Sequence, residues 1–291
     1  MLSQVERVVS SCETSCNTEA GIIASLAAAA LRQGTNHEII LMVEMGDLRE
    51  GIMPEDLTDM ALLVTRTPGV LLRGIGANFA CLAGPAPTAE DMAALSSLAS
   101  SAEAECGPFV DVVSGGSSAN LRWALDTGPA GRVNSLRLGE AILLGTDPVS
   151  GNPISGLHTD AFVLQAEVIE TKTKSKLAPL KLSDPALSAL SLVPGNHWKT
   201  RSILAIGLQD TDPAGLIFPA AVSCIGATSD HLVVETTNCP LRIGSEITLR
   251  LNYSALLHAM AAPDVAKVLC DGRPSADCGS ASRNGRHPAL L

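Results

Sequence analysis

Short apolar segments alternate with helical patterns through the first half of the chain, and this alternation limits the possible folds more than any other feature. The expected helices cover residues 19–33, 54–65 and 88–106, and the expected strands cover residues 38–44, 71–80, 110–114 and 141–145. Strands that alternate with helices are typical of βα units with parallel pairing. Segment 38–44 is nearly all apolar, as expected for a strand that is covered on both faces. The sequence therefore predicts a parallel α/β arrangement.

The pattern changes after about Gly151. The expected strands there cover residues 161–171, 201–207, 221–226, 231–237 and 246–252, with turn signals and no long helical pattern between them. This spacing predicts an antiparallel β domain. Residues 172–198 contain three prolines and are expected to form a long loop. From Cys270 onward the chain has almost no apolar pattern and is expected to be a disordered tail.

These patterns divide the chain into an α/β part over residues 1–150, a β-rich part over residues 151–269 and a tail over residues 270–291. The 291 residues suffice for a barrel and a smaller unit. Hydrophobic residues make up 46% of the chain but aromatic residues only 2%, so the core must consist mainly of Ala, Val, Leu and Ile.

Charge and composition argue against several classes of partner. The formal net charge is −10, which disfavours nucleic acid because phosphate binding needs clustered Lys and Arg. The most apolar stretch, residues 20–31, is too short to span a membrane, and the N-terminus has no signal-peptide pattern. The eight cysteines are scattered, which favours free thiols over a metal site. We expect a soluble cytoplasmic protein.

Polar and glycine-rich segments follow the expected strands of the first half. These are Met-Gly-Asp-Leu-Arg-Glu-Gly at 45–51, Gly-Ile-Gly-Ala-Asn at 74–78, Ser-Gly-Gly-Ser-Ser at 114–118 and Leu-Arg-Leu-Gly-Glu at 136–140. In a βα barrel, such positions form the carboxyl face of the strands, where ligand sites lie. Glycines allow a backbone to approach an anion closely, and adjacent hydroxyls and amides can donate hydrogen bonds to phosphate.

Together with segments 207–212 and 229–234, these motifs resemble the alanine/ornithine racemase group of enzymes that depend on pyridoxal 5′-phosphate (PLP). The resemblance runs from about residue 12 to residue 269. It implies a TIM-like βα barrel, incomplete in this chain, followed by an antiparallel β domain. It also implies PLP as cofactor, an amino acid as substrate and a homodimer, because sites in this family are shared between subunits.

The resemblance assigns cofactor contacts to segments 114–118 and 136–140. Ser117 and Ser118 match the turn that holds the cofactor phosphate, although the family usually has Asn at the position of Ser117. Arg137 matches an arginine that faces the pyridine nitrogen, and the Gly139 backbone would meet the phosphate. Glu140 completes this cofactor-binding set. The alternatives are an ordinary Gly/Ser turn between a strand and a helix, and a surface ion pair for Arg137.

Four further residues receive a role from the resemblance or from their position beside a family motif. Asn78 stands where alanine racemases have a histidine that lines the cofactor ring, and Arg49 matches an arginine at the substrate end. Leu208 replaces the tyrosine that serves as one of the two catalytic bases, so Asp210 and His231 become the candidates for that base. A histidine has a suitable pKa for this role. The alternatives are a turn-stabilising asparagine at 78, a solvated arginine at 49, a turn aspartate at 210 and a histidine at 231 that caps a strand.

The chain contains no lysine before Lys172. The family binds PLP covalently through a lysine on the first barrel strand, and by resemblance this chain begins near the fourth strand. The hypothesis is a PLP-dependent amino-acid racemase that lacks the N-terminal lysine-bearing part, with little or no activity of the chain alone. Two alternatives stay open: a non-catalytic protein that binds PLP or another phosphorylated ligand, and an oligomerisation module without a ligand.

Overall fold

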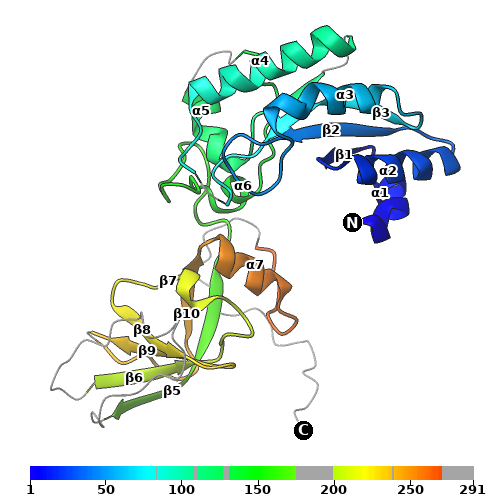
Figure 1. The fold of residues 1–291 in the computed structure, drawn as a ribbon. Coiled ribbons are helices and arrows are strands. Elements are labelled where there is room, and N and C mark those ends of the chain that lie inside the picture. The colour runs from blue at the N-terminus through cyan, green and yellow to red at the C-terminus, as the bar shows by residue number, and fades with distance from the viewer. Residues whose placement is uncertain (83, 108–110, 127–130, 175–198, 238, 271–291) are drawn as a thin grey trace. The chain divides into compact units, whose positions relative to one another are not determined.

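The computed structural model describes residues 1–270 except 83, 108–110, 127–130, 175–198 and 238 (Figure 1). The chain divides into two compact units, unit 1 over Met1–Thr159 and unit 2 over Asp160–Leu291. Each unit has its own sheet. The two sheets follow the order of fold types that the sequence predicts, a parallel βα part and then an antiparallel β part.

Unit 1 contains a four-stranded parallel sheet in the order β1-β2-β3-β4. Its strands are β1 (Thr14–Asn17), β2 (His37–Val43), β3 (Val70–Ala77) and β4 (Val112–Ser114). Because all four strands run the same way, their carboxyl ends meet at one edge of the sheet. A register shift between Ile39 and Ile40 interrupts the pairing of β2 with β3.

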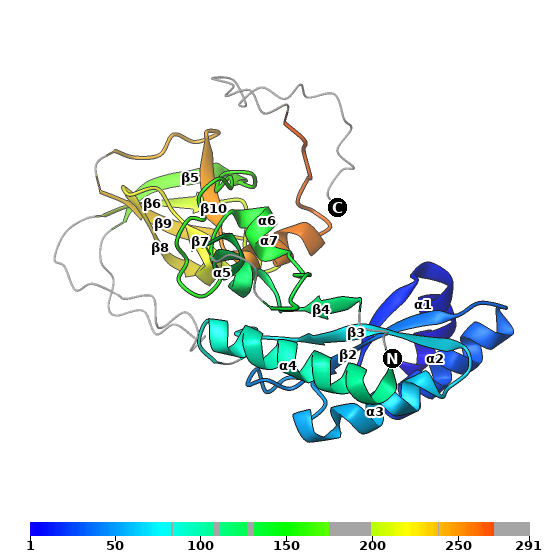
Figure 2. The same cartoon turned by 90° about the horizontal axis from the view of Figure 1, so that it is seen from above.

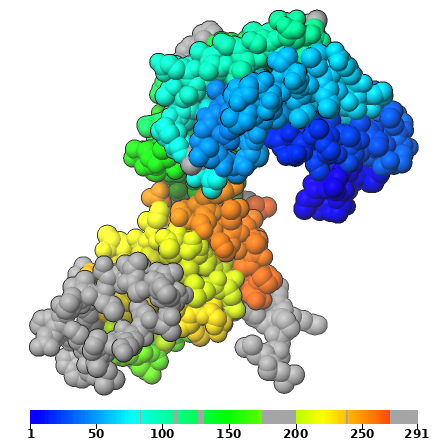
Figure 3. Space-filling model, viewed as in Figure 1, coloured from blue at the N-terminus to red at the C-terminus, as the bar shows by residue number. Residues whose placement is uncertain are grey.

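Helices cover one face of this sheet. Side chains of α2, α3 and α4 pack in one cluster with those of β2 and β3, and Figure 2 shows α3 and α4 on the same side of these strands. Helices α3 and α4 also form part of the surface seen in Figure 3. The longer helices of unit 1 are α1 (Val5–Ser11), α2 (Ala20–Arg32), α3 (Leu57–Thr65) and α4 (Ala89–Cys106). The shorter ones are η1 (Leu2–Gln4), η2 (Pro54–Asp56), η3 (Ser118–Asn120), α5 (Leu121–Asp126) and α6 (Glu140–Leu144).

A capping box formed by Thr88 and Asp91 precedes α4. The Thr88 hydroxyl accepts a hydrogen bond from Asp91 N at 3.2 Å, and the Asp91 carboxylate accepts one from Thr88 N at 2.7 Å. This reciprocal pair satisfies two backbone donors that the first turn of a helix leaves free. It fixes the start of α4 at Ala89, one residue after the predicted boundary.

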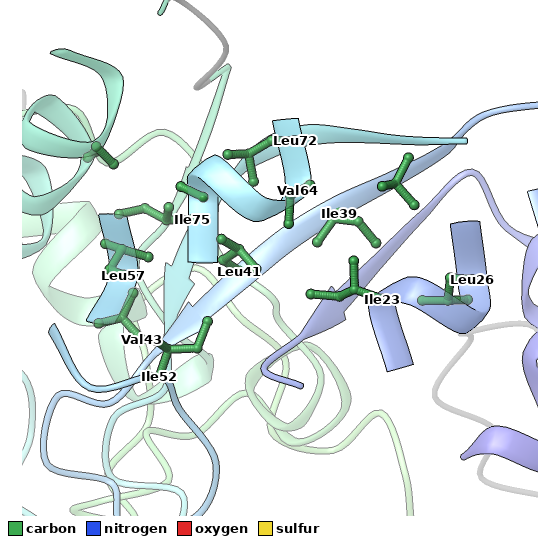
Figure 4. Packing of buried hydrophobic residues seen from close by; sticks show 14 of the residues in the cluster. Ile23, Leu26, Ile39, Leu41, Val43, Ile52, Leu57, Val64, Leu72 and Ile75 are labelled. Carbon is green, nitrogen blue, oxygen red and sulfur yellow. The ribbon is translucent and has the colours of Figure 1, made fainter. Parts of the chain in front are cut away.

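The core of unit 1 lies between the sheet and these helices. Ile39, Leu41 and Val43 alternate along β2 and are almost completely buried, and they pack in one cluster with Ile23 of α2 and Leu57 of α3 (Figure 4). Burying one such side chain contributes about 1.5–3 kcal/mol. The core consists of aliphatic side chains with few aromatic rings, as the composition predicts.

The prediction of a strand at residues 141–145 is wrong. Glu140–Leu144 forms helix α6, which ends at Gly145 with φ 66°. A short apolar run has no periodicity that separates a strand from one buried helical turn. Ala141 and the leucines favour a helix, and Gly145 adopts the left-handed conformation that ends it.

Unit 2 contains a six-stranded antiparallel sheet in the order β7-β10-β5-β6-β9-β8. Its elements are β5 (Leu164–Lys174), β6 (Lys199–Leu204), η4 (Pro213–Gly215), β7 (Leu216–Ile217), β8 (Val222–Ala227), β9 (Leu232–Thr236), β10 (Glu246–Leu251) and α7 (Tyr253–Ala261). The five predicted strands are all present, whereas β7 and α7 were not predicted.

The predicted loop over residues 172–198 is wrong at its beginning. Residues 172–174 extend β5 and pair with residues 199–201 of β6. Residues 175–198 lie outside the described part of the chain, as does the predicted tail from residue 271. Among the helices that the structure describes, none has both the length and the apolar content to cross a membrane.

Candidate active site

The candidate site lies at the edge of the unit 1 sheet where β2, β3 and β4 end. Segments 44–51, 78–82 and 115–118 follow these strands, and segment 136–140 follows the bridge between Ser114 and Ser135. They carry the residues of unit 1 that the sequence singled out. In parallel βα folds this edge gathers side chains from several strands. The site is built below loop by loop.

The loop after β2 is held by two acidic side chains. Glu44 Oε1 accepts hydrogen bonds from Gly46 N at 2.6 Å and Leu48 N at 3.1 Å. Asp47 is buried, and its Oδ1 accepts hydrogen bonds from two backbone amides of the loop after β3 at 2.7 and 2.9 Å. Leu48 has φ 57°, an uncommon conformation for a side chain of this type. These contacts give the loop a fixed shape and connect it to its neighbour.

Arg49 and Glu50 follow in the same loop and form an ion pair. Glu50 Oε1 accepts hydrogen bonds from Arg49 Nη2 at 2.7 Å and from Asn78 Nδ2 at 2.8 Å. Its Oε2 accepts a further hydrogen bond from Arg49 Nε. These hydrogen bonds, of which that from Arg49 has the largest effect, hold the pKa of Glu50 below its usual value. Glu50 is therefore ionised near neutral pH. Arg49 Nη1 also lies 2.6 Å from Cys81 Sγ.

Arg137 is held by acceptors at the ends of β3 and β4. Its Nη1 donates to Ser114 Oγ at 2.5 Å, and its Nη2 donates to Ala77 O at 3.0 Å. The same Nη2 donates to Asn78 Oδ1. The structure therefore brings three of the predicted residues, Arg49, Asn78 and Arg137, into one hydrogen-bonded network with Glu50.

Ser118 connects the third loop to the fourth. Its buried hydroxyl accepts hydrogen bonds from Gly139 N at 3.3 Å and Ala141 N at 3.1 Å. Gly116 has φ 101°, and a Cβ there would lie 2.9 Å from the ring of Phe79, so the turn requires glycine. Ser117 is half-buried beside Ser118. The predicted phosphate-side residues thus lie together, with hydroxyl and amide groups of the kind that bind phosphate.

Glu140 begins α6 next to these groups. It is half-buried, and burial raises its pKa, with a further contribution from the Asp147 carboxylate. A carboxyl group in this position is easier to protonate than an exposed one. A bound phosphate would act in the same direction, because it adds negative charge nearby.

Asp210 and His231, the predicted catalytic candidates, lie in unit 2 on neighbouring turns. The backbone amides of Leu208 and Gln209 donate to Thr228 O and Ser229 O, which connects the two turns. Asp210 is buried, and its Oδ2 accepts a hydrogen bond from Gly207 N at 2.8 Å. His231 bonds to Thr228 through its backbone. These contacts give Asp210 a structural task in its own turn, and the role of either residue as a base stays a prediction.

Two residues near this site were missed by the sequence analysis. Glu50 stands next to Arg49 in segment 45–51, so its position in the sequence could have marked it as a residue of the site. Cys16 lies on β1 and pairs with Ile40 of β2. Cys16 keeps exposed surface, yet desolvation by the groups around it raises the pKa of its thiol. The charge of Arg137 lowers this pKa and the charge of Glu50 raises it, so both charges lie within electrostatic range. No sequence signal marked β1, which has only four residues.

Lysine is absent from unit 1, because the first lysine of the chain is Lys172. In unit 2, Lys172 Nζ and Lys174 Nζ lie 3.0 and 2.8 Å from the Glu170 carboxylate on the exposed end of β5. Lys267 donates to Ala262 O. These three described lysines therefore have partners within unit 2.

Comparison with known proteins identifies the family. The family model for the N-terminal domain of alanine racemase matches residues 4–147. The ornithine racemase of Acetoanaerobium sticklandii is 33% identical over 275 residues, which cover 92% of this chain and 77% of that protein. The chain belongs to the alanine racemase family of isomerases. The lysine racemase of Thermotoga maritima is 36% identical over 237 residues, or 80% of this chain and 66% of that protein.

Solved structures show the same fold at lower identity. The D-threonine aldolase from Filomicrobium marinum matches with a TM-score of 0.62 and 14% identity, over 89% of this chain and 67% of that one. The alanine racemase from Streptomyces coelicolor A3(2) also has a TM-score of 0.62 and 14% identity, over 88% of this chain and 70% of that one. The prediction of a TIM-like βα part followed by a β domain is thereby confirmed.

Proposed function

We propose that the chain acts in PLP-dependent amino-acid racemisation and that unit 1 makes the non-covalent contacts to the cofactor. The observation that carries this proposal is the network of Arg137, Asn78, Glu50 and Arg49 at the carboxyl edge of the sheet. Family membership supports the reaction class. The network supplies charged groups where a cofactor of this fold would lie.

Arg137 fits the ring end of PLP. A guanidinium has five N–H donors. Hydrogen bonds to Ser114, Ala77 and Asn78 use three of them, and the other two can serve a ligand. An arginine facing the pyridine nitrogen donates a hydrogen bond to the unprotonated ring, because it does not give up its proton near neutral pH. When bound, PLP stabilises the negative charge left on Cα after a proton is removed.

The phosphate end would be held by Ser118 and the backbone of Gly139. The Ser118 hydroxyl now accepts hydrogen bonds from Gly139 N and Ala141 N. A phosphate oxygen could take over these amide donors, while the hydroxyl rotates to donate to the phosphate. Ser117 and Glu140 would border this end.

The residues of unit 1 do not supply the covalent link to PLP, because they include no lysine. We therefore propose that residues 1–291 alone bind PLP without a covalent bond and racemise amino acids slowly. Lys172 and Lys174 pair with Glu170, and Lys267 donates to Ala262 O. While these contacts persist, none of the three lysines acts as a catalytic base. A non-catalytic protein that binds PLP is the second candidate, and the same absence of lysine favours it.

We propose a diamino acid as the substrate, since the two relatives named above are an ornithine racemase and a lysine racemase. Arg49 would bind the α-carboxylate, because a guanidinium donates well to a carboxylate. Asp210 or His231 would serve as the second base. A homodimer is part of this proposal.

The test is racemisation of L-ornithine, L-lysine and L-alanine by the purified chain with PLP, measured by chiral chromatography with and without methylamine. A free amine can take the place of an absent lysine base. We expect slow conversion that methylamine accelerates, with the diamino acids converted faster than alanine. No conversion under either condition would contradict the racemase and leave the non-catalytic binding protein.

A further inference from the structure

Glu50 uses both carboxylate oxygens inside the candidate site. Oε1 accepts hydrogen bonds from Arg49 Nη2 and Asn78 Nδ2, and Oε2 accepts one from Arg49 Nε. The pair of parallel contacts with Arg49 is the two-point geometry that favours arginine with carboxylate. The third contact extends the influence of Glu50 to the next strand, because Asn78 directly follows β3.

The Asn78 amide can be held in only one orientation by these neighbours. Its nitrogen only donates hydrogen bonds, and its oxygen only accepts them. Glu50 offers acceptors on one side of Asn78, whereas Arg137 offers donors on the other. A flipped amide would place oxygen against the carboxylate and NH₂ against the guanidinium. Asn78 is also buried, so water does not compete freely for either group.

Arg137 is in turn positioned by three acceptors. Ser114 Oγ and Ala77 O belong to the ends of β4 and β3, whereas Asn78 Oδ1 is the acceptor whose orientation depends on Glu50. A planar guanidinium held by three such contacts cannot rotate without breaking one of them. The position of Arg137 therefore depends on a residue that it does not touch in the described contacts.

We propose that Glu50 is a positioning residue of the site: it fixes the Arg137 guanidinium through the Asn78 amide while it holds Arg49 directly. A carboxylate suits both tasks, since it accepts from two partners at once and balances part of the charge of two arginines. The consequence for the cofactor rests on the proposed function above. The coupling between Glu50 and Arg137 is a property of the chain itself and is testable without a ligand.

The first experiment uses pyridoxine 5′-phosphate, which has the ring and phosphate of PLP but no aldehyde. Its dissociation constant and the pH titration of its bound ring absorbance are measured for the wild-type chain, Glu50→Gln and Asn78→Ala. We expect roughly three- to ten-fold weaker binding and a higher pKa of the bound ring nitrogen in both variants. A glutamine at position 50 sets its NH₂ group against a donor of Arg49 or Asn78 in either orientation, so Arg137 is held less firmly opposite the ring nitrogen. A loss of packing alone would weaken binding without moving this pKa.

The matched control is Glu55→Gln, since Glu55 is an exposed carboxylate in the same loop region, in η2. It should bind and titrate as the wild type does. The inference is overturned if Glu50→Gln binds and titrates like Glu55→Gln while Arg137→Gln changes both properties. If the wild-type chain does not bind the probe, the proposed function fails, and the ligand-free experiment decides the inference.

The ligand-free experiment is a double-mutant cycle of thermal unfolding midpoints with Glu50→Gln, Arg137→Gln and the double variant. Because Gln has the shape of Glu and Glu50 is partly exposed, we expect all variants to fold, which circular dichroism verifies. If Glu50 and Arg137 are coupled through Asn78, the midpoint shift of the double variant differs from the sum of the two single shifts. In a chain that also carries Asn78→Ala, the shift of the double variant equals that sum. Additive shifts in the wild-type background overturn the inference.

Discussion

Arg137 and Glu50 show how single residues give the candidate site its charge and direction. Glu50 and Arg49 compensate each other's charge in an ion pair, whereas the Arg137 guanidinium donates to the neutral oxygens of Ser114, Ala77 and Asn78. The positive charge of Arg137 is thus less compensated than that of Arg49. In the proposed function, this less compensated arginine would donate a hydrogen bond to the cofactor ring.

Arg137→Lys tests this residue directly. A lysine keeps the charge but lacks the planar fork that serves several acceptors at once, so we expect binding of pyridoxine 5′-phosphate to weaken about ten-fold. The measurement is a fluorescence titration of the purified chain. Arg122→Lys serves as the control, since Arg122 is half-exposed and lies 4.0 Å from Asp147. Equal affinities for both variants would contradict a specific role of Arg137.

His37 gives a second prediction at this scale. The ring is buried, its Nε2 lies 2.7 Å from Ser15 Oγ, and burial lowers the pKa of His37. The folded chain therefore disfavours the proton relative to the unfolded chain. The stability that the neutral His37 ring contributes is complete above about pH 6.5, the pKa of an unperturbed histidine. It is lost as the pH falls from there to the lower pKa of His37 in the folded chain.

We expect the urea midpoint of the wild-type chain to fall between pH 7.5 and pH 5.5 by more than that of His37→Gln. Glutamine can keep a hydrogen bond to Ser15 but does not titrate. The control is His158→Gln, because His158 is exposed. The account of His37 fails if its variant and the control show the same change with pH.

At the scale of elements, β2 determines the packing of unit 1. Alternate residues of this strand face the helices, where Ile39 and Leu41 have no exposed surface. The neighbouring strand β3 has an exposed leucine, Leu71, which is 52% accessible. The two leucines therefore offer a matched comparison of buried and exposed positions in one sheet.

Leu41→Ala is expected to lower the free energy of unfolding by about 2–5 kcal/mol, because it removes buried methyl groups and leaves a cavity. Leu71→Ala is expected to cost much less, about 0.5 kcal/mol, since its side chain is partly in water already. Urea unfolding followed by circular dichroism measures both. Similar losses in the two variants would place the core of unit 1 elsewhere.

The elements also show which structure the sequence could predict. Long helical segments such as those of α2 and α4 were predicted to within one or two residues, because their length and pattern distinguish a helix from a strand. The five-residue run at α6 carried no decisive period and was predicted as a strand. Arg49, Asn78 and Arg137 were predicted from motifs, but their connection through Glu50 depends on side-chain contacts between loops that no single motif encodes.

At the scale of the whole molecule, the chain joins a parallel βα unit to an antiparallel β unit. Unit 1 holds the network around Arg137, and unit 2 holds Asp210, His231 and all the lysines of the chain. The proposed division of tasks follows from this distribution. In this proposal the cofactor contacts come from unit 1, which contains no lysine.

The most direct test of this account is an absorbance titration of the purified 291-residue chain with PLP, followed by borohydride reduction and mass spectrometry. The account predicts saturable binding of PLP that dialysis reverses after borohydride treatment, with no reduced adduct on any lysine in stoichiometric amount. A stoichiometric adduct at one lysine would show a covalent anchor within the chain and contradict the proposed non-covalent site. The absence of saturable binding would contradict the cofactor site itself.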